Sequence, residues 1–276
     1  MTYGVRSGVV WFGATLALDD VSLIVEPGSV VAVVGGDGAG KTTLLRSLVG
    51  KVRLERGEVD APPPEAIGYL PATAGSWLSL TVAQNMDFVG GIYGLSGQEL
   101  VSRRDELLER ASLSSSADRL ASQLSGGMRR KLGFSMAMVH DPPLLVLDEP
   151  STGIDPVSRV DLWRLVSEAA AAGAAVVMST TYLDEAERAA SLLALDGGRT
   201  LAHGTLQQVL DSFDGTVART PTPHRPAWAW RRGREYHEYW PTTADVPLDA
   251  VVVTPDLEDV VITLSLLKRR DKEPAS

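Results

Sequence analysis

A glycine-rich loop near the start of the sequence carries its most specific chemistry. Residues 35–43 read GGDGAGKTT, which matches the pattern Gly-x-x-x-x-Gly-Lys-Thr. In such a loop the backbone N–H groups surround a phosphate, the lysine reaches the β- and γ-phosphates, and the threonine hydroxyl ligates Mg²⁺. We therefore predict that a nucleotide is bound by Gly35, Gly36, Asp37, Gly38, Ala39, Gly40, Lys41, Thr42 and Thr43.

The elements that must position this loop are predicted on both sides of it. The apolar run from Ser29 to Val34 predicts a buried strand that enters the loop, and Leu44, Leu45 and Leu48 recur at helical spacing after it. A glycine-rich turn with a chance lysine is the alternative. It would not require the order strand, loop, helix, so this order favours phosphate binding.

Two acidic residues end another apolar run. The run from Leu144 to Leu147 is typical of a strand buried on both faces, and Asp148 and Glu149 follow it directly. Carboxylates at the C-terminal end of a strand lie where α/β sheets bind ligands. We expect Asp148 to hold Mg²⁺, through water, and Glu149 to orient or deprotonate the water that attacks the γ-phosphate. The alternative is two solvated acids that begin a loop, but Pro150 ends the strand rigidly beside the loop's sheet.

Strands and helices alternate along most of the chain. Helical spacing is predicted in an insertion around 82–140 and again over 158–172 and 183–190, with a strand over 174–179. This alternation predicts an α/β core around a mostly parallel sheet. The apolar run from Val9 to Leu18 predicts a buried strand of an N-terminal antiparallel β piece. It is not read as a signal peptide because no small-residue cleavage site follows.

The segment from Leu124 to Met128, LSGGM, lies between the glycine loop and the strand with the two acids. Together these features resemble the ATP-binding cassette (ABC) ATPases, the nucleotide-binding subunits of ABC transporters. The resemblance covers Phe12 to about Thr205 and implies a P-loop α/β cassette that hydrolyses Mg²⁺-ATP. It also implies that Ser125, Gly126 and Gly127 bind the γ-phosphate of ATP held by the other subunit of a head-to-tail dimer, using amides at a helix start. Taken alone, these residues would also fit a plain helix cap.

Three further segments extend the resemblance. The segment from Ser151 to Pro156 resembles the D-loop that crosses the family's dimer interface. Phe12, which precedes Gly13, falls where the family has an aromatic residue that stacks on adenine, although a core phenylalanine is the alternative. The segment from Asp256 to Val260 resembles the C-terminal end of ATPases from drug-export and related ABC-2-type systems.

The sequence departs from the family at two polar positions. The family has a glutamine after the strand that ends in Pro71 and a histidine after Ser179-Thr180, but this chain has Ala72 and Thr181. Gln84 lies in a predicted helix and is not expected to replace the glutamine. Removing one positioned polar donor typically slows catalysis by about 10²–10³. We therefore hypothesise slow hydrolysis in the chain's own site, unless another residue restores the lost contacts.

Composition limits the remaining possibilities. The chain has 276 residues, no cysteine, and a net charge of −9 from 26 Lys plus Arg and 35 Asp plus Glu. This balance argues against nucleic-acid binding, and the lack of cysteine excludes disulfides and zinc–thiolate sites. No apolar run approaches the ~20 residues that span a bilayer. We expect a soluble protein on the cytoplasmic side of the cell membrane, peripheral through a partner.

The C-terminal stretch differs in composition from the rest. It carries Trp228, Trp230 and Trp240 with several arginines, which predicts a small β-rich appendage more readily than a docking or nucleic-acid surface. His224 and His237 lack acidic neighbours at ligand spacing and are interpreted as structural.

The complete prediction is a cassette over 1–210, with a helical subdomain over about 82–140, and an appendage over 211–276. The resemblance implies ATP and Mg²⁺ as ligands, and a membrane permease and a second ABC ATPase, the latter more readily in a heterodimer, as partners. Export is the expected direction. Two alternatives remain open: a soluble ABC-type ATPase without a transporter, or an ATP-binding regulatory subunit with little turnover.

Overall fold

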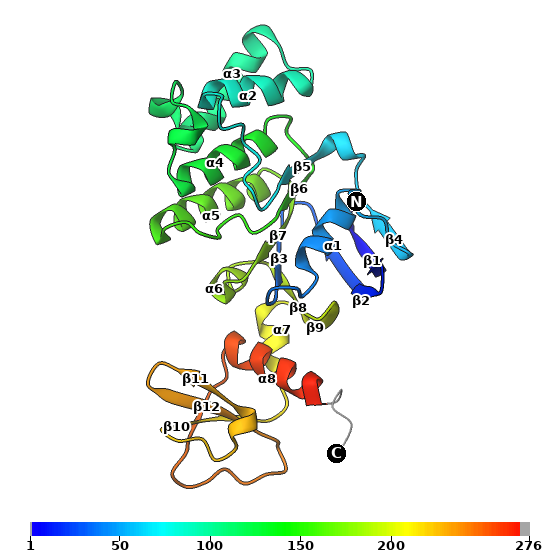
Figure 1. Ribbon diagram of the computed structural model, residues 1–276, viewed down its shortest axis with the longest axis vertical. Helices are drawn as coiled ribbons and strands as arrows, with labels where there is room; N and C mark the ends of the chain where they lie inside the picture. The colour runs from blue at the N-terminus through cyan, green and yellow to red at the C-terminus, as the bar shows by residue number, and fades with distance from the viewer. Residues whose placement is uncertain (1, 271–276) are drawn as a thin grey trace.

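The computed structural model describes residues 2–270, and this part of the chain forms three β-sheets (Figure 1). The largest sheet has the order β5-β6-β7-β3-β8-β9, and all its neighbours are parallel except β8 and β9. Helices cover both of its faces, so the predicted α/β fold is confirmed. The strands are β3 (Val30–Val34), β5 (Ile67–Leu70), β6 (Leu144–Leu147), β7 (Ala175–Thr180), β8 (Ser191–Asp196) and β9 (Arg199–Gly204). The covering helices include α1 (Lys41–Leu48), α5 (Pro156–Ala171) and α6 (Leu183–Ala186).

Alternate residues of the central strands face two different cores. Leu144 and Val146 of β6 pack in the core that contains α1, whereas Leu145 and Leu147 pack in the core that contains α5. Successive side chains of a strand point to opposite faces, so a strand covered on both sides needs an unbroken apolar run. Because β3, β6 and β7 are parallel, the loops that follow them meet at one edge of the sheet.

The N-terminal part is a three-stranded antiparallel sheet in the order β2-β1-β4. β1 (Tyr3–Phe12) and β2 (Thr15–Val25) form a hairpin, and β4 (Arg56–Asp60) pairs with the other edge of β1. The single strand predicted from Val9 to Leu18 is therefore wrong. The chain turns at Gly13, whose φ of 60° glycine adopts without strain, and the run is divided between two strands.

The helical insertion extends above the central sheet in Figure 1. It contains α2 (Val82–Ile92), α3 (Gly97–Arg110) and α4 (Gly126–Ala137), with the 3₁₀ turns η2 (Ser114–Ser116) and η3 (Ala121–Gln123). A third such turn, η1 (Pro64–Ala66), precedes β5. The helix predicted over 183–190 is shorter than expected. The Ala190 N–H donates to the Val30 carbonyl, so the chain has already left α6 to pair with β3.

The C-terminal part follows α7 (Leu206–Asp211) and combines a four-stranded antiparallel sheet with a helix, α8 (Leu257–Arg270). The β-rich appendage was predicted, but α8 was not. The residues at its start form a capping box, which could have predicted the helix. The Asp256 carboxylate accepts from the Asp259 N–H at 3.0 Å, and the Asp259 carboxylate accepts from the Asp256 N–H at 3.2 Å. The strands are β10 (Thr216–Thr220), β11 (Ala229–Arg232), β12 (Glu235–Trp240) and β13 (Val251–Val253), with the 3₁₀ turn η4 (Pro226–Trp228). Within residues 2–270 no helix is long and apolar enough to cross a membrane.

Candidate functional site

The glycine loop joins β3 to α1 and closes around its own lysine. The Lys41 side chain is buried, and its Nζ donates to the carbonyls of Gly35 at 2.8 Å and Gly36 at 3.1 Å. The same Nζ lies 3.4 Å from Oε1 of Glu149. The loop lysine and the second acid of the β6 strand, 108 positions apart in the printed sequence, therefore form an ion pair.

Close packing of neighbouring backbone requires glycine at both ends of the motif. Gly35 has a φ of 152°, and a Cβ there would lie 2.3 Å from the Leu195 carbonyl oxygen. Gly40 has a φ of 103°, and a Cβ there would lie 2.8 Å from the Ala17 carbonyl oxygen. These two glycines let the loop approach β8 and β2, which fixes the place of α1.

A cavity of about 470 Å³ lies over the loop, within the ~300–1,000 Å³ range of small-molecule sites. It brings loop residues together with the β1-β2 hairpin and Glu149. Its lining consists of Thr15, Leu16, Ala17, Asp37, Gly38, Ala39, Gly40, Lys41, Thr42, Thr43, Glu149 and Gly197. A second cavity, of about 540 Å³, lies beside the C-terminal end of α1 and has no acidic residue in its lining. Of these two cavities, the one of about 470 Å³ is lined by the residues predicted to bind the nucleotide and by Glu149.

Thr42 and Asp148 meet at the start of α1. The Thr42 hydroxyl donates to Oδ1 of Asp148 at 3.0 Å, and the Ser179 hydroxyl donates to the same oxygen at 2.9 Å. Asp148 is fully buried, and its Oδ2 has no hydrogen-bond partner. A buried carboxylate oxygen without a donor is costly unless a cation or water meets it. The Thr42 hydroxyl and the Asp148 carboxylate therefore fit a hard divalent cation such as Mg²⁺.

Glu149 has an unusual backbone conformation. Its φ is 48°, in the left-handed region that residues other than glycine rarely adopt, and such strain clusters at functional sites. The Glu149 N–H donates to the Ser179 hydroxyl oxygen at 2.9 Å, and its Oε2 accepts from the Thr152 hydroxyl at 3.1 Å. These bonds direct one carboxylate oxygen to Lys41 and the other to Thr152.

The LSGGM segment begins α4. The Ser125 hydroxyl accepts from the Met128 N–H at 3.2 Å, and Ser125 and Gly126 are exposed. Gly127 is buried, and a Cβ there would lie 2.3 Å from Oγ of Ser158 on α5. None of the three predicted contact residues lines the P-loop cavity of the same chain.

Phe12 lies at the end of β1, opposite Thr15, which lines the cavity. The residue is 53% exposed, so the alternative of a core phenylalanine is wrong. The ring itself is not part of the cavity lining in the described residues.

Comparisons with known proteins agree with this geometry. Residues 18–152 match the protein family described as ABC transporter. The chain is 35% identical over 215 residues to the Nod factor export ATP-binding protein I of Cupriavidus metallidurans, covering 74% of this chain and 71% of that protein. The chain belongs to the ABC transporter ATP-binding family.

Other relatives of this ABC ATP-binding chain carry drug-related names. It is 35% identical over 218 residues to the probable multidrug ABC transporter ATP-binding protein of Escherichia coli, covering 75% of this chain but only 38% of that protein. Among solved structures, an ATP binding subunit of an ABC transporter superposes with a TM-score of 0.70 and 29% identity, covering 77% of this chain and 93% of that chain.

The two positions interpreted from the sequence as departures from the family lie on exposed loops. Ala72 follows Pro71 after β5, and Thr181 follows β7, and both are exposed. Gln84 lies on α2, where its side-chain oxygen accepts from the Thr81 N–H at 2.9 Å, so it is engaged in a helix cap. Arg130 on α4 donates to the Pro71 carbonyl at 3.3 Å.

The Arg130 guanidinium interacts electrostatically with both acids of the site. Burial lowers its pKa below the usual arginine value, and the negative charges of Glu149 and Asp148 oppose that shift. Arg130 therefore links the loop that precedes Ala72 to the two acids.

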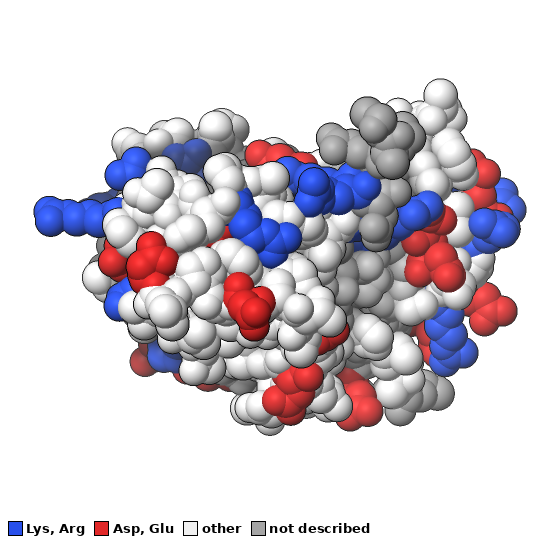
Figure 2. Space-filling view, turned by 90° about the horizontal axis from the view of Figure 1, so that it is seen from below, with Lys and Arg blue, Asp and Glu red and all other residues white. Residues whose placement is uncertain are grey.

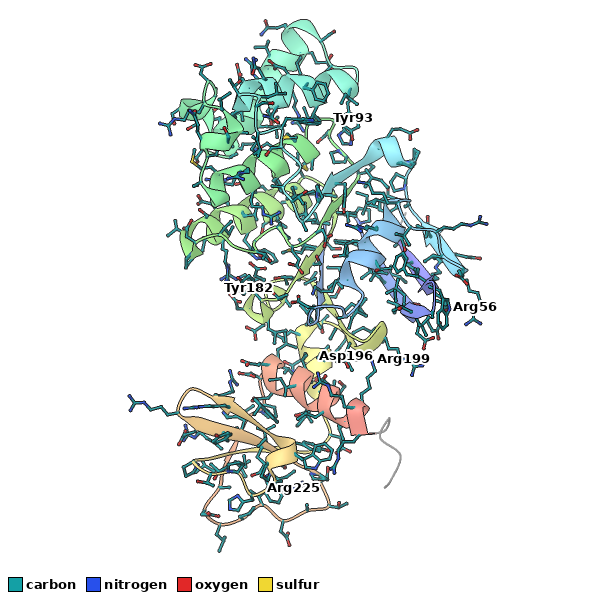
Figure 3. The ribbon with its side chains drawn as sticks, viewed as in Figure 1. Arg56, Tyr93, Tyr182, Asp196, Arg199 and Arg225 are labelled. Atoms are coloured by element: carbon teal, nitrogen blue, oxygen red, sulfur yellow. The ribbon has the colours of Figure 1, made fainter. Side chains whose placement is uncertain are left out.

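The tryptophans of the C-terminal part pack against aromatic and cationic neighbours. The Arg225 guanidinium lies 5.5 Å from the ring centre of Trp228 and 5.1 Å from that of Trp240 (Figure 3). Trp240 and Tyr239 are buried, as the core interpretation expects, whereas Trp228 and Trp230 are partly exposed. Figure 2 views this end of the molecule, and basic and acidic side chains are interspersed over it.

The two histidines of this part have acidic partners, which the sequence did not show, and these contacts fit the structural role interpreted for them. His237 Nδ1 lies 2.8 Å from Oδ1 of Asp259, and His224 Nε2 lies 3.2 Å from Oδ2 of Asp249. Both contacts join segments distant in sequence, which is why neighbouring residues gave no signal. Within residues 2–270 no group of three or more His, Cys, Asp and Glu residues could hold a metal ion.

Sequence reasoning missed several residues of the site. Thr15, Leu16, Ala17 and Gly197 line the cavity but carry no catalytic type or motif. No role is predicted for Ser179 from the sequence, yet its hydroxyl contacts both Asp148 and Glu149. Its place at the end of a buried strand, beside the acid-bearing strand, was the available signal.

Proposed function

We propose that this chain is the ATP-binding subunit of an ABC transporter and that it hydrolyses ATP at the P-loop cavity. The observation that carries the proposal is the convergence of two segments on one cavity: Lys41, Thr42 and Glu149 line it, and Asp148 accepts a hydrogen bond from Thr42. Family membership makes ATP the nucleotide of choice. Phe12, exposed beside the cavity, is proposed to stack on the adenine ring.

Each residue has a distinct proposed role. The loop amides and Lys41 would bind and orient the phosphates, with the lysine exchanging its carbonyl partners for phosphate oxygens. Thr42 and Asp148 would hold Mg²⁺, and that ion, when bound, neutralises charge on the β- and γ-phosphates. Glu149 would orient the attacking water or accept its proton, from a carboxylate already directed at the cavity.

A direct experiment is equilibrium titration of the protein with Mg²⁺-ATP. A charge-assisted hydrogen bond contributes about 1.5–3 kcal/mol, so Lys41→Ala should weaken binding by about 10- to 100-fold. Lys51→Ala is the matched control because Lys51 is exposed and lies over the Tyr69 ring, outside the cavity. Equal affinities of the native chain and Lys41→Ala would contradict the proposed site.

A second subunit would complete the site. Ser125 and Gly126 are exposed at the start of a 12-residue helix, yet neither lines the cavity of their own chain. This supports the head-to-tail arrangement in which they bind ATP held by a partner ATPase. Ala72 and Thr181 further support an asymmetric heterodimer, in which this chain's own site turns over slowly while its LSGGM segment completes the partner's site.

A membrane permease is the other proposed partner, and export is the proposed direction. Relatives named for multidrug, Nod factor export and daunorubicin resistance support export. Exposed apolar side chains on and just before α2 support docking: Trp77 and Phe88 lie edge to face at 4.7 Å, and Leu78 and Ile92 are also exposed. The protein would then lie on the cytoplasmic side of the cell membrane, and no nucleic acid is proposed as a ligand.

Fractionation of the source cells tests the docking. Phe88→Asp should lower the share of the chain recovered with membranes while leaving Mg²⁺-ATP affinity within about twofold, because Phe88 is outside the cavity. Val252→Asp places the same charge on an exposed valine of the C-terminal sheet and serves as the control. Unchanged membrane recovery of Phe88→Asp, or recovery with ribosomes instead, would contradict the permease proposal.

A regulatory ATP-binding subunit with little turnover is the second candidate. It is favoured by the exposed methyl and hydroxyl side chains at positions 72 and 181, which are too short to act where an amide or imidazole would. Trapping the bound nucleotide and measuring whether it remains ATP separates the two functions.

A further inference from the structure

A fully buried carboxylate lies behind the two acids of the site. Glu185 of α6 has no exposed surface. Its Oε2 accepts hydrogen bonds from the Ser151 hydroxyl at 2.7 Å and the Thr180 hydroxyl at 2.5 Å. Its Oε1 lies 3.4 Å from Nε of Arg159 on α5. One carboxylate therefore joins the loop after β6, the end of β7 and α5.

The two hydroxyl partners are next to the residues that form the site. Ser151 follows Glu149 by two positions in the same loop. Thr180 follows Ser179, whose hydroxyl holds both the Asp148 carboxylate and the Glu149 N–H. The Thr180 hydroxyl oxygen also accepts from the Tyr182 N–H at 3.0 Å. Glu185 thus fixes the loop that carries Glu149 and, on the other side, the segment around position 181.

The strained backbone of Glu149 explains why such fixing matters. A φ of 48° at a glutamate persists only where surrounding contacts hold it. Glu185 itself is held by its neighbours, since Arg159 also pairs with Asp184 and its guanidinium lies 4.3 Å from the ring centre of Tyr182. Figure 3 shows Tyr182 beside α6. Buried ion pairs add little net stability, which favours a geometric role for this one.

We propose that Glu185 is a positioning residue for ATP hydrolysis, because it holds the Glu149 loop and the 179–182 segment in the arrangement that directs Glu149 into the cavity. The inference rests on the proposed ATPase function and on the proposed role of Glu149. Glu185 does not line the cavity, so it acts through Ser151 and Thr180 and not on ATP itself.

Single-turnover hydrolysis, with the full-length protein in excess over radiolabelled Mg²⁺-ATP, tests the proposal even if turnover is slow. Small misplacements of a catalytic group cost up to about 10²-fold in rate, so Glu185→Gln and Thr180→Val should each slow hydrolysis by about 10-fold or more. The Kd for Mg²⁺-ATP should stay within about twofold, because neither side chain lines the cavity. Thr180→Ser, which keeps the hydroxyl, should retain the native rate.

The controls separate this proposal from a structural role and from the proposed function. Glu187→Gln, at an exposed glutamate two residues after Glu185, should behave as the native protein. A lowered melting temperature with a native rate in both Glu185→Gln and Thr180→Val would overturn the inference, as would a Thr180→Ser rate as low as that of Thr180→Val. If Glu185→Gln does not fold, the Thr180 pair alone decides between these results. A native rate in Glu149→Gln would instead overturn the role of Glu149, independently of the Glu185 variants.

Discussion

At the scale of single residues, the site is built by hydroxyl groups that hold carboxylates. Thr42 and Ser179 both donate to one oxygen of Asp148, and this leaves the other oxygen buried and without a partner. Ser179 also accepts from the backbone of Glu149. The acids are thus fixed before any ligand binds, and an arrangement fixed in advance needs no reorganisation during the reaction.

Ser179→Ala should therefore slow ATP hydrolysis more than it weakens ATP binding. Removing a residue that hydrogen-bonds to a metal ligand typically lowers metal affinity or activity by about 10- to 100-fold, and we expect a rate loss in that range. Single-turnover rates and Mg²⁺-ATP titration measure the two quantities. Ser79→Ala, at an exposed serine before α2, is the control. A native rate for Ser179→Ala would show that Asp148 and Glu149 do not depend on this hydroxyl.

At the scale of elements, the start of α4 and the start of α5 lock together. Gly127 has no room for a Cβ because Ser158 of α5 lies where that atom would be, whereas a Cβ at Gly126 would be 3.4 Å from the nearest atom, the Gly153 carbonyl oxygen. The α5 helix is in turn capped by Asp155, whose carboxylate accepts from the Ser158 N–H at 3.0 Å and its hydroxyl at 2.6 Å. The close approach of Gly127 and Ser158 therefore positions the LSGGM segment and the segment from Ser151 to Pro156 relative to each other.

Gly127→Ala should destabilise the fold by about 1–3 kcal/mol, the usual cost of overpacking, because either α4 or Ser158 must move. Gly126→Ala should cost less, since its Cβ would meet a neighbour near ordinary contact distance. Urea denaturation of both variants measures the difference in unfolding free energy. Equal stability of the two variants would contradict the close contact at Gly127.

The cap of α5 predicts a pH dependence. The hydrogen bonds from the Ser158 hydroxyl and then from the Ser158 N–H lower the pKa of Asp155 below its usual value. A lowered carboxyl pKa in the folded state adds stability above the unfolded pKa of about 3.9 and loses it as pH falls through the folded pKa. Ser158→Ala should raise the Asp155 pKa in an NMR titration. It should also lower stability at neutral pH more than at pH values below the folded pKa.

At the scale of the whole molecule, the sequence predicts those features that are formed by residues contiguous in the chain. The P-loop, the acid-bearing strand and the parallel core follow from contiguous runs such as 30–43 and 144–149, and all three are present in the fold. The pairing of Ser179 with Asp148, or of Glu185 with Ser151, joins residues about 30 positions apart, and side-chain contacts of that kind need the fold itself. The same holds for His237 and Asp259 in the C-terminal part.

The C-terminal part is tied to the cassette through α8. Leu257 and Val260 of α8 pack with Val209 of α7 and Ala202 of β9, and Lys268 donates to the Asp196 carbonyl of β8. Asp196 and Arg199 flank the turn between β8 and β9, at the end of the central sheet that faces the C-terminal part in Figure 3. Because β8 leads to Gly197, which lines the ATP cavity, the C-terminal part contacts the same hairpin that borders the site.

The central claim is an ATP-binding site whose hydrolysis is slow because Ala72 and Thr181 replace an amide and an imidazole. Steady-state hydrolysis of the purified chain tests it most directly, alongside the variant with Ala72→Gln and Thr181→His and the same variant with Glu149→Gln. We predict that the double variant is about 10²-fold or more faster than the native chain at equal Mg²⁺-ATP affinity, and that adding Glu149→Gln abolishes the gain. A native chain that turns over as fast as the double variant would contradict the account.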